Sequence, residues 1–174
     1  MPGHPFNMRI DNLDHYPEAV ERLADWHFEE WRHLYPDHSR EDFAHDLRRC
    51  LEQAMIPSTW VLVSEDAGEA GREQTGNGEI WGSASVVEED MDNNRDLGPW
   101  LANVFVHPHY RGRGFGSALV RHVMAQCRAA GMESLYLFTP DQQGLYASLG
   151  WQALRVESYH GEQVTIMTAR LDQD

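Results

Sequence analysis

The residues with the clearest chemical potential lie between Val104 and Ala118, where the sequence reads V-F-V-H-P-H-Y-R-G-R-G-F-G-S-A. Gly112, Gly114 and Gly116 occur at alternate positions. Glycines permit positive φ angles and leave no Cβ between main chain and ligand, so successive N–H groups can converge on one point. The apolar-periodic run that follows predicts a helix, whose N-terminus favours an anion. This stretch therefore predicts a turn that binds a diphosphate.

Two other phosphate-binding turns fit the sequence less well. The dinucleotide fingerprint has the spacing G-x-G-x-x-G near the start of a βαβ unit, whereas here the pattern is R-G-x-G-x-G and lies past the middle of the chain. The nucleotide P-loop needs a lysine after its last glycine, and this sequence contains no lysine. Arg111 and Arg113 add positive charge beside the glycines in an acidic chain, although an ordinary solvated pair is the alternative.

The stretch closely resembles the acetyl-coenzyme A motif of the GNAT family of N-acetyltransferases, in which a strand ending in V-x-P is followed by R-G-x-G-x-G and a helix. A second segment, L-Y-A-S-L-G-W from Leu145 to Trp151, resembles the family's Y-x-x-x-G-F/W segment after the fifth strand. Two motifs in the family's order are more specific than either alone.

The resemblance implies acetyl-coenzyme A as the acyl donor, without a metal. In the family, backbone amides of the glycine turn bind the diphosphate. Here they would belong to Arg111, Gly112, Arg113, Gly114, Phe115, Gly116 and Ser117. The feeding strand pairs with the pantetheine arm like an added strand, a role that falls to the backbone of Val104, Phe105 and Val106.

The resemblance also implies direct attack of a neutral primary amine on the acetyl thioester in a ternary complex. A strand amide at Phe105 or Val106 would stabilise the oxyanion, a contribution of ~3 kcal/mol for one donor. Tyr146 occupies the position of the family tyrosine that protonates the leaving thiolate. Its alternative role is that of a half-buried aromatic on a short amphipathic helix.

The general base is where the sequence departs from the family pattern. Many members carry a glutamate on the feeding strand, but the matching residue here is Ala102, and the neighbouring Asn103 has no basic group. We expect a water relay assisted by a carboxylate. The candidates for that help or for the base itself are Glu88, Glu89, Asp90 and His107, with Glu88 taken as the first choice.

The segment from Trp31 to Asp42 resembles the corresponding part of aminoglycoside 6′-N-acetyltransferases, which have a W-x-x-L pattern followed by an acidic second helix. Candidate acceptor-binding residues are Trp31, Tyr35, Glu89 and Asp90; core packing of the aromatics and a merely solvated acidic loop are the alternatives. The leading hypothesis is acetylation of a small or cationic amine. A peptide N-terminal acetyltransferase, an acyl-coenzyme A binding module without turnover and a globular adaptor remain open.

The length, composition and net charge of the chain limit which of these hypotheses are possible. The 174 residues, 41% hydrophobic, predict a single domain spanning residues 1–174. No run approaches the ~20 apolar residues of a membrane span and no signal peptide is apparent, so we expect a cytoplasmic protein without a membrane partner. Fourteen arginines against 28 acids give a net charge of −14. This charge argues against nucleic acid and permits a cationic acceptor, although solubility at high salt would explain it equally well.

The cysteines and histidines carry no separate hypothesis. Cys50 and Cys127 each fall on an apolar helical face, which predicts buried thiols. His107 and His109 flank the end of a strand without a third ligand at metal-binding spacing, so no zinc site is predicted. The oligomeric state stays open, although homodimers are common among such folds.

The element order predicts an α+β fold with a mixed, mostly antiparallel sheet of about seven strands flanked by helices. Strands are expected at 8–10, 59–65, 80–87, 100–106, 135–139, 152–158 and 164–171. Helices are expected from 17 to before Pro36, from the N-cap Ser39 through Met55, over 115–130, and from Pro140-Asp141. The polar stretches 66–78 and 88–96 are expected to be a hairpin connection and an acidic loop.

Overall fold

The computed structural model describes residues 7–65 and 78–172 and contains one seven-stranded sheet. Its strands are β1 (Met8–Asn12), β2 (Ser58–Ser64), β3 (Glu79–Val87), β4 (Trp100–Val106), β5 (Ser134–Thr139), β6 (Gln152–Tyr159) and β7 (Glu162–Arg170). They lie in the order β1-β2-β3-β4-β5-β7-β6. Only β4 and β5 are parallel neighbours. The expected α+β class and the mixed, mostly antiparallel sheet are confirmed.

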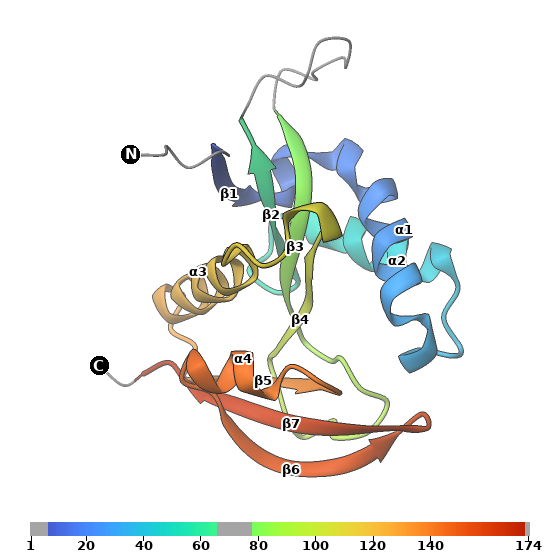
Figure 1. The fold of residues 1–174 in the computed structure, drawn as a ribbon, viewed down its shortest axis with the longest axis vertical. Helices are drawn as coiled ribbons and strands as arrows, with labels where there is room; N and C mark the ends of the chain where they lie inside the picture. Colours follow the sequence, from blue (N-terminus) through green and yellow to red (C-terminus); the bar gives the residue numbers. More distant parts are fainter. Residues whose placement is uncertain (1–6, 66–77, 173–174) are drawn as a thin grey trace.

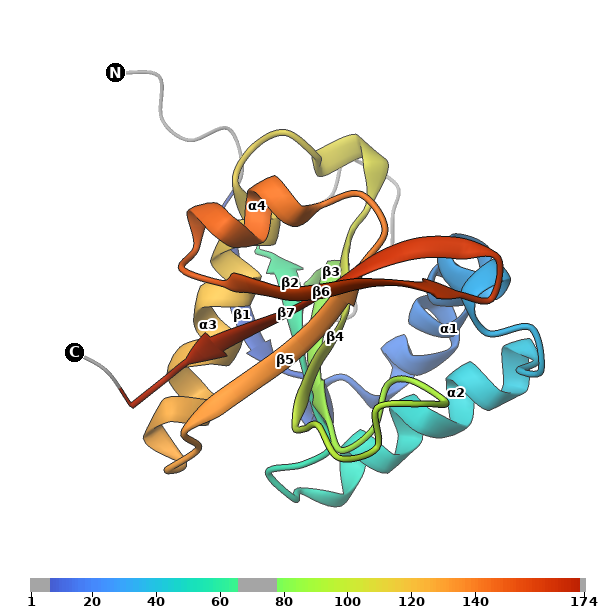
Figure 2. The same ribbon diagram turned by 90° about the horizontal axis from the view of Figure 1, so that it is seen from below.

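Helices cover both faces of the sheet (Figures 1 and 2). The helices α1 (Val20–Trp31) and α2 (Arg40–Arg49) lie on one face, and α3 (Phe115–Ala129) and α4 (Gln143–Ser148) lie on the other. The alternation along β2 explains both layers, because successive side chains of a strand point to opposite faces. Val61 and Val63 join the core beneath α1 and α2, whereas Trp60 and Leu62 join the core beneath α3.

The first two helices are shorter than predicted. The pattern that began at Pro17 contains a 3₁₀ turn before α1 and another over Arg32–Leu34 after it. The predicted N-cap Ser39 is confirmed, with a capping box to Asp42. The second helix, expected to run through Met55, ends at Arg49 because a 3₁₀ turn follows and Gln53 takes a left-handed conformation (φ 63°).

The other predicted elements lie close to their expected positions, with one shift at α4. This helix begins at Gln143 rather than at Pro140-Asp141. The Thr139 hydroxyl accepts hydrogen bonds from the N–H groups of Asp141 and Gln142, at 3.4 and 3.0 Å, and holds them in a turn before the helix. Most of the predicted hairpin connection at 66–78 lies outside the described residues.

The centre of the sheet opens at β4. Its parallel register with β5 consists of one pair, Trp100 with Tyr136, and beyond this pair the two strands diverge (Figure 1). On its other edge β4 carries a bulge, because Ala102 pairs with Ser85 and Phe105 pairs with Ser83. Two residues of β4 thus stand opposite one residue of β3, which bends the strand at that point. The divergence leaves space between β4 and β5.

Candidate active site

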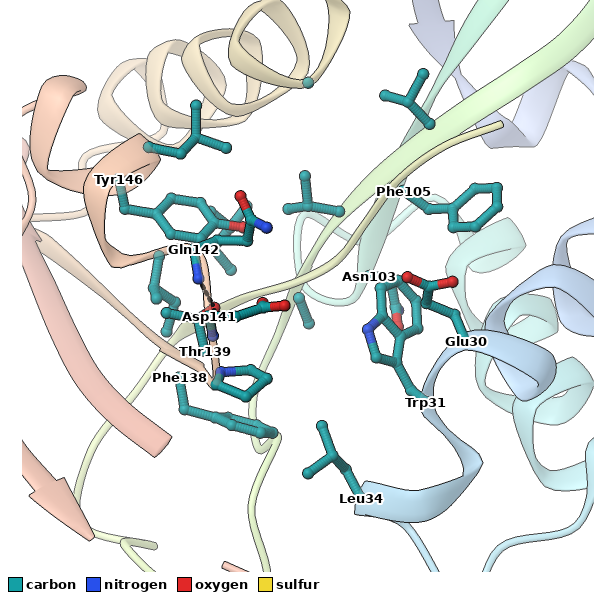
Figure 3. A pocket seen from close by; sticks show the side chains of 18 of the residues that line it. Glu30, Trp31, Leu34, Asn103, Phe105, Phe138, Thr139, Asp141, Gln142 and Tyr146 are labelled. Carbon is teal, nitrogen blue, oxygen red and sulfur yellow. Dashed lines mark hydrogen bonds between the residues drawn. The ribbon is translucent and has the colours of Figure 1, made fainter. Parts of the chain in front are cut away.

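A pocket of about 1020 Å³ lies where β4 and β5 diverge. Its lining comes from the end of α1 and the turn after it, from β4, from the glycine turn, from the β5–α4 connection and from the β6–β7 turn. Figure 3 shows Tyr146 and Gln142 on one side, with Glu30 and Trp31 on the opposite side. Segments distant in the sequence therefore build the two walls of one site.

The glycine turn forms one end of the pocket. Gly112 (φ 77°) and Gly114 (φ 85°) both take left-handed conformations, and a Cβ built on either would meet no protein atom within 4 Å. Gly114 is the N-cap of α3. The Ala118 N–H donates to the Gly114 carbonyl at 3.1 Å. The N–H groups between these two residues belong to the first turn of the helix, where the backbone hydrogen bonds of the helix have not yet begun. Open space beside the N–H groups of a helix N-terminus suits a phosphate group.

The two arginines of the turn have different surroundings. Arg111 donates from Nε to the Val106 carbonyl at 2.7 Å, and its Nη2 lies 3.7 Å from a Glu30 carboxylate oxygen. Its guanidinium also lies 5.4 Å from the centre of the Phe105 ring. Arg111 thus ties the turn to the end of β4 and to α1. Arg113 is exposed and is not among the pocket-lining residues.

The two candidate oxyanion donors on β4 are not equivalent. The His107 N–H donates to the Trp81 carbonyl on β3 at 2.8 Å. Because N–H groups alternate along a strand, the Val106 N–H points away from β3 and towards the side where β5 diverges. The Val106 carbonyl, bound by Arg111, is on that same side. Phe105 instead lies opposite Ser83 of β3. The geometry therefore favours the Val106 N–H over the Phe105 N–H as the oxyanion donor.

A buried chain of hydrogen bonds holds the β4 bulge. Asn103 has φ 56°, a left-handed conformation that asparagine tolerates better than most residues. The Ser83 hydroxyl donates to the Asn103 carbonyl at 2.7 Å and lies 2.8 Å from Nε2 of His27. Burial lowers the pKa of His27 to about 3, so its ring is neutral and Nε2–H donates to Ser83. The Asn103 side chain donates to Ser85 at 3.2 Å.

Tyr146 lines the pocket from α4, where it is buried. Its ring packs edge-on against Trp151, with centroids 6.1 Å apart, and its carbonyl accepts a hydrogen bond from the Trp151 N–H at 3.0 Å. Gly150, at φ 96°, makes this tight turn possible. Burial, with a smaller contribution from Asp141, raises the pKa of Tyr146 to about 12. The phenol is therefore protonated at neutral pH.

Three of the four predicted acceptor residues meet on the opposite wall. Trp31, Tyr35 and Asp90 all line the pocket, and the Tyr35 hydroxyl donates to Oδ1 of Asp90 at 2.7 Å. Burial raises the pKa of Asp90 to about 7 and also raises the pKa of Tyr35. Glu89, the fourth candidate, is exposed and does not line the pocket.

The residue predicted as the first-choice general base does not line the pocket. Glu88 is exposed and is not among the pocket-lining residues, because the chain turns away after β3 and returns only at Asp90. His107, another candidate, packs between Trp26 and Trp81, with ring centroids 5.3 and 5.1 Å away, and also does not line the pocket. Asp90 is the one pocket carboxylate among the bases that the sequence suggested.

Sequence reasoning missed several pocket residues. The missed polar and aromatic ones include Glu30, Phe138, Asp141, Gln142 and Glu162. Asp141 had a usable signal, because it follows the carboxyl end of β5, next to the strand that feeds the glycine turn. Glu30 precedes Trp31 and had no such signal, because a charged residue at the end of a helix is normally solvated.

The remaining predictions concern thiols, metals and membranes. Cys50 and Cys127 are both free and buried, as predicted, and burial raises the pKa of each to about 11. Within residues 7–65 and 78–172, no three histidine, cysteine or acidic side chains come together in a group that could hold a metal. No helix of this part of the chain is long and apolar enough to cross a bilayer.

Comparison with known proteins identifies the family. The family model of the acetyltransferase (GNAT) domain matches residues 58–153, which is more than half of the chain. The chain therefore belongs to the GNAT acetyltransferase family. The match extends from β2 to the start of β6 and includes the glycine turn and Tyr146.

Solved structures share the fold at low sequence identity. The aminoglycoside 6′-acetyltransferase type Ii superposes with a TM-score of 0.66 at 15% identity, covering 95% of this chain and 99% of that one. The Salmonella typhimurium protein yncA, solved with its cofactor acetyl-CoA, gives 0.65 at 16% identity, with 97% and 96% covered. The ribosomal-protein-S18-alanine N-acetyltransferase from Escherichia coli gives 0.61 at 22% identity, with 97% and 96% covered. No curated protein sequence matches the chain.

Proposed function

We propose that this protein is a single-domain N-acetyltransferase that moves an acetyl group from acetyl-coenzyme A to the primary amine of a small, cationic acceptor. The observation that carries the proposal is the convergence of three parts on one pocket. These parts are the glycine turn at the N-terminus of α3, the unpaired edge of β4 and Tyr146 from α4. Family membership supports the reaction class.

The pocket suits coenzyme A at three places. The amides of Gly112 to Ser117 and the open space above Gly112 and Gly114 fit the diphosphate. The β4 edge at Val104 and Val106 borders the divergence from β5, and such an edge can pair with an extended amide chain. Acetyl-coenzyme A supplies the activated thioester. Since Arg111 is bound to Val106 and lies near Glu30, we assign it to holding the turn in place.

Tyr146 serves as the general acid in this proposal. The neutral amine nitrogen forms a bond to the acyl carbon and gives a tetrahedral intermediate. As this intermediate collapses, the carbon–sulfur bond breaks, the departing sulfur takes the phenolic proton, and the proton lost by the attacking nitrogen restores the phenol through pocket water. The pKa of about 12 keeps this proton in place until negative charge develops on the sulfur. The Val106 N–H is the oxyanion donor, positioned by the bulge at Asn103.

The proton of the incoming ammonium leaves through water that the pocket carboxylates order. Glu30, Asp90, Asp141 and Glu162 all line the cavity, so their combined charge favours a cationic acceptor. The divergent β4 edge and the buried Tyr146 favour catalysis over binding alone. A peptide amine remains the second candidate, because a pocket of about 1020 Å³ that opens at the protein surface admits an extended N-terminus.

Thiol release from acetyl-coenzyme A, followed with a thiol reagent, tests the proposal. The acceptors are alkylamines, polyamines, aminoglycosides and peptides with free N-termini, each compared with an acceptor-free blank. We expect amine-dependent release with a small cationic acceptor and a mass increase of one acetyl group on that acceptor. Tight binding of acetyl-coenzyme A without release by any amine would contradict the enzyme and favour a binding module.

A further inference from the structure

The acceptor wall contains a carboxylate without a counter-ion. Asp90 lines the pocket and accepts its hydrogen bond from the neutral Tyr35 hydroxyl, at 2.7 Å. Among the residues that the structure describes, neither an arginine nor a histidine forms an ion pair with Asp90. The charged group that acts on it is Asp46 of α2, which repels it. Asp90 is half-buried, and a carboxylate with reduced access to water is costly unless a cation joins it.

The other pocket carboxylates have partners or water. Glu30 lies 3.7 Å from Arg111 and Glu162 lies 3.5 Å from the His33 ring. Asp141 is exposed to solvent. Asp90 therefore differs from the other three acidic side chains of the lining, because it is half-buried and its hydrogen-bond partner is the neutral Tyr35 rather than a basic group.

Aromatic rings surround the same place. The Tyr35 and Phe138 ring centroids are 6.5 Å apart, and Phe43 packs edge-on against Tyr35 at 5.7 Å. Phe138 in turn packs against Tyr159 at 5.4 Å. These contacts fix the two rings at the pocket wall beside Asp90. Aromatic rings and a carboxylate that line the same part of a pocket both attract positive charge, so together they favour an ammonium group.

This place lies away from the catalytic tyrosine. Figure 3 shows Phe138 and Leu34 at the end of the pocket opposite Tyr146, with Thr139 and Gln142 between them. The ring of Tyr35 contacts that of Phe138, and the Tyr35 hydroxyl donates to Asp90, so Asp90 belongs to the Phe138 end. A nitrogen bound at Asp90 is therefore not the nitrogen that reacts near Tyr146.

We propose that Asp90, with the rings of Tyr35 and Phe138, binds a second ammonium group of the acceptor, so that the preferred acceptors are diamines or longer polyamines. This subsite deepens the proposed acetyltransferase function and rests on it for the reacting amine. The free protein keeps Asp90 partly protonated near neutral pH, since its pKa is raised to about 7. A bound ammonium restores its charge. The other ionisable groups that face it are Tyr35, Tyr159 and Asp46.

Steady-state kinetics with matched amines test the subsite. For the wild type at pH 8, we expect kcat/KM for 1,4-diaminobutane to exceed that for butylamine by about 10-fold or more, the effect of one partly desolvated charge contact. Asp90→Asn should remove this preference by raising KM for the diamine, so that the kcat/KM values of the two amines become equal within about twofold. Other α,ω-diamines extend the comparison to different chain lengths.

Glu89→Gln is the matched control, because it removes the neighbouring charge from an exposed side chain outside the pocket. It should leave the diamine preference unchanged. An equal fall of kcat for both amines in Asp90→Asn would overturn the subsite and make Asp90 the general base. Equal kcat/KM of the two amines with the wild type would also overturn it.

Direct binding separates this inference from the proposed function. If neither amine supports thiol release, calorimetry of each amine with the wild type and with Asp90→Asn still tests the subsite. Tighter binding of 1,4-diaminobutane that disappears in the variant supports the subsite, even though the enzyme proposal fails. The opposite outcome is turnover of butylamine without any preference for the diamine. It would support the acetyltransferase function and contradict the subsite at Asp90.

Discussion

The two walls of the pocket are built from different chemical groups. The side that we assign to coenzyme A offers mainly backbone, namely the amides at the start of α3, the left-handed glycines of the turn and the open edge of β4. The acceptor side offers side chains, with Tyr35 and Asp90 brought together across 55 residues of sequence. Backbone sites tolerate most substitutions except those that change main-chain geometry, whereas side-chain sites depend on each residue. This contrast makes opposite predictions for substitutions on the two walls.

The largest effect is expected on the backbone wall, from Gly114→Val. Valine is strained at φ 85° and would place its side chain in the open space over the turn. We expect the Kd for acetyl-coenzyme A, measured by calorimetry, to rise by about 100-fold or more. Gly131→Val is the control, since Gly131 has φ 87° and equally open surroundings but lies at the far end of α3. Equal loss of affinity in both variants would contradict the location of the diphosphate.

The next largest effect should come from Tyr146→Phe. Removing the phenol should lower kcat by roughly 10- to 1000-fold, the usual range for a general acid, and leave acetyl-coenzyme A affinity nearly unchanged. Because the pKa is about 12, the wild-type rate should show no loss from Tyr146 deprotonation below about pH 10. Tyr136→Phe, outside the pocket lining, should retain activity. Unchanged turnover in Tyr146→Phe would refute its role.

A smaller effect is expected at the bulge, which connects the two walls. Asn103→Val places a β-branched residue at φ 56° and removes the hydrogen bond to Ser85. We expect about 1–3 kcal/mol less stability by urea unfolding and roughly 10-fold lower kcat, because the Val106 amide shifts. Asn103→Gly accepts the same φ without strain and should recover most of the activity. Equal activity of the two variants with the wild type would show that the bulge does not position the oxyanion donor.

The smallest effect is a gain in folding stability, which we expect for Asp90→Asn in the protein without ligands. The unfolded carboxyl ionises near its ordinary pKa of 3.8, whereas burial delays ionisation in the folded protein to about pH 7. Ionisation therefore favours the unfolded state, and the wild type loses stability as pH rises from about 4 to 7. The variant lacks this loss, so urea unfolding should show it about 1–3 kcal/mol more stable at pH 8 and equal at pH 4. Equal stability at both pH values would mean that Asp90 is hydrated.

Much of the fold followed from the sequence because its signals are local. The strand patterns, the N-cap Ser39 and the helix after the glycine turn depend on neighbours within a few residues, and each lies near its expected position. Errors occurred where tertiary contacts decided the boundary. The helix expected through Met55 ends at Arg49 and is followed by the left-handed Gln53, a turn for which the periodicity of the apolar residues gave no signal.

The sequence by itself predicted the half of the pocket that we assign to coenzyme A, because a glycine turn, its feeding strand and the following helix are contiguous and their backbone amides need no distant partner. Only the tertiary structure decided the acceptor half. It excluded Glu88 and Glu89 from the pocket lining, and brought Asp90 to Tyr35. It also explained Asn103, whose importance lies in its left-handed backbone rather than in a basic group. Burial and the approach of distant side chains depend on how the helices and strands pack together, and the spacing of residues along the sequence does not predict that packing.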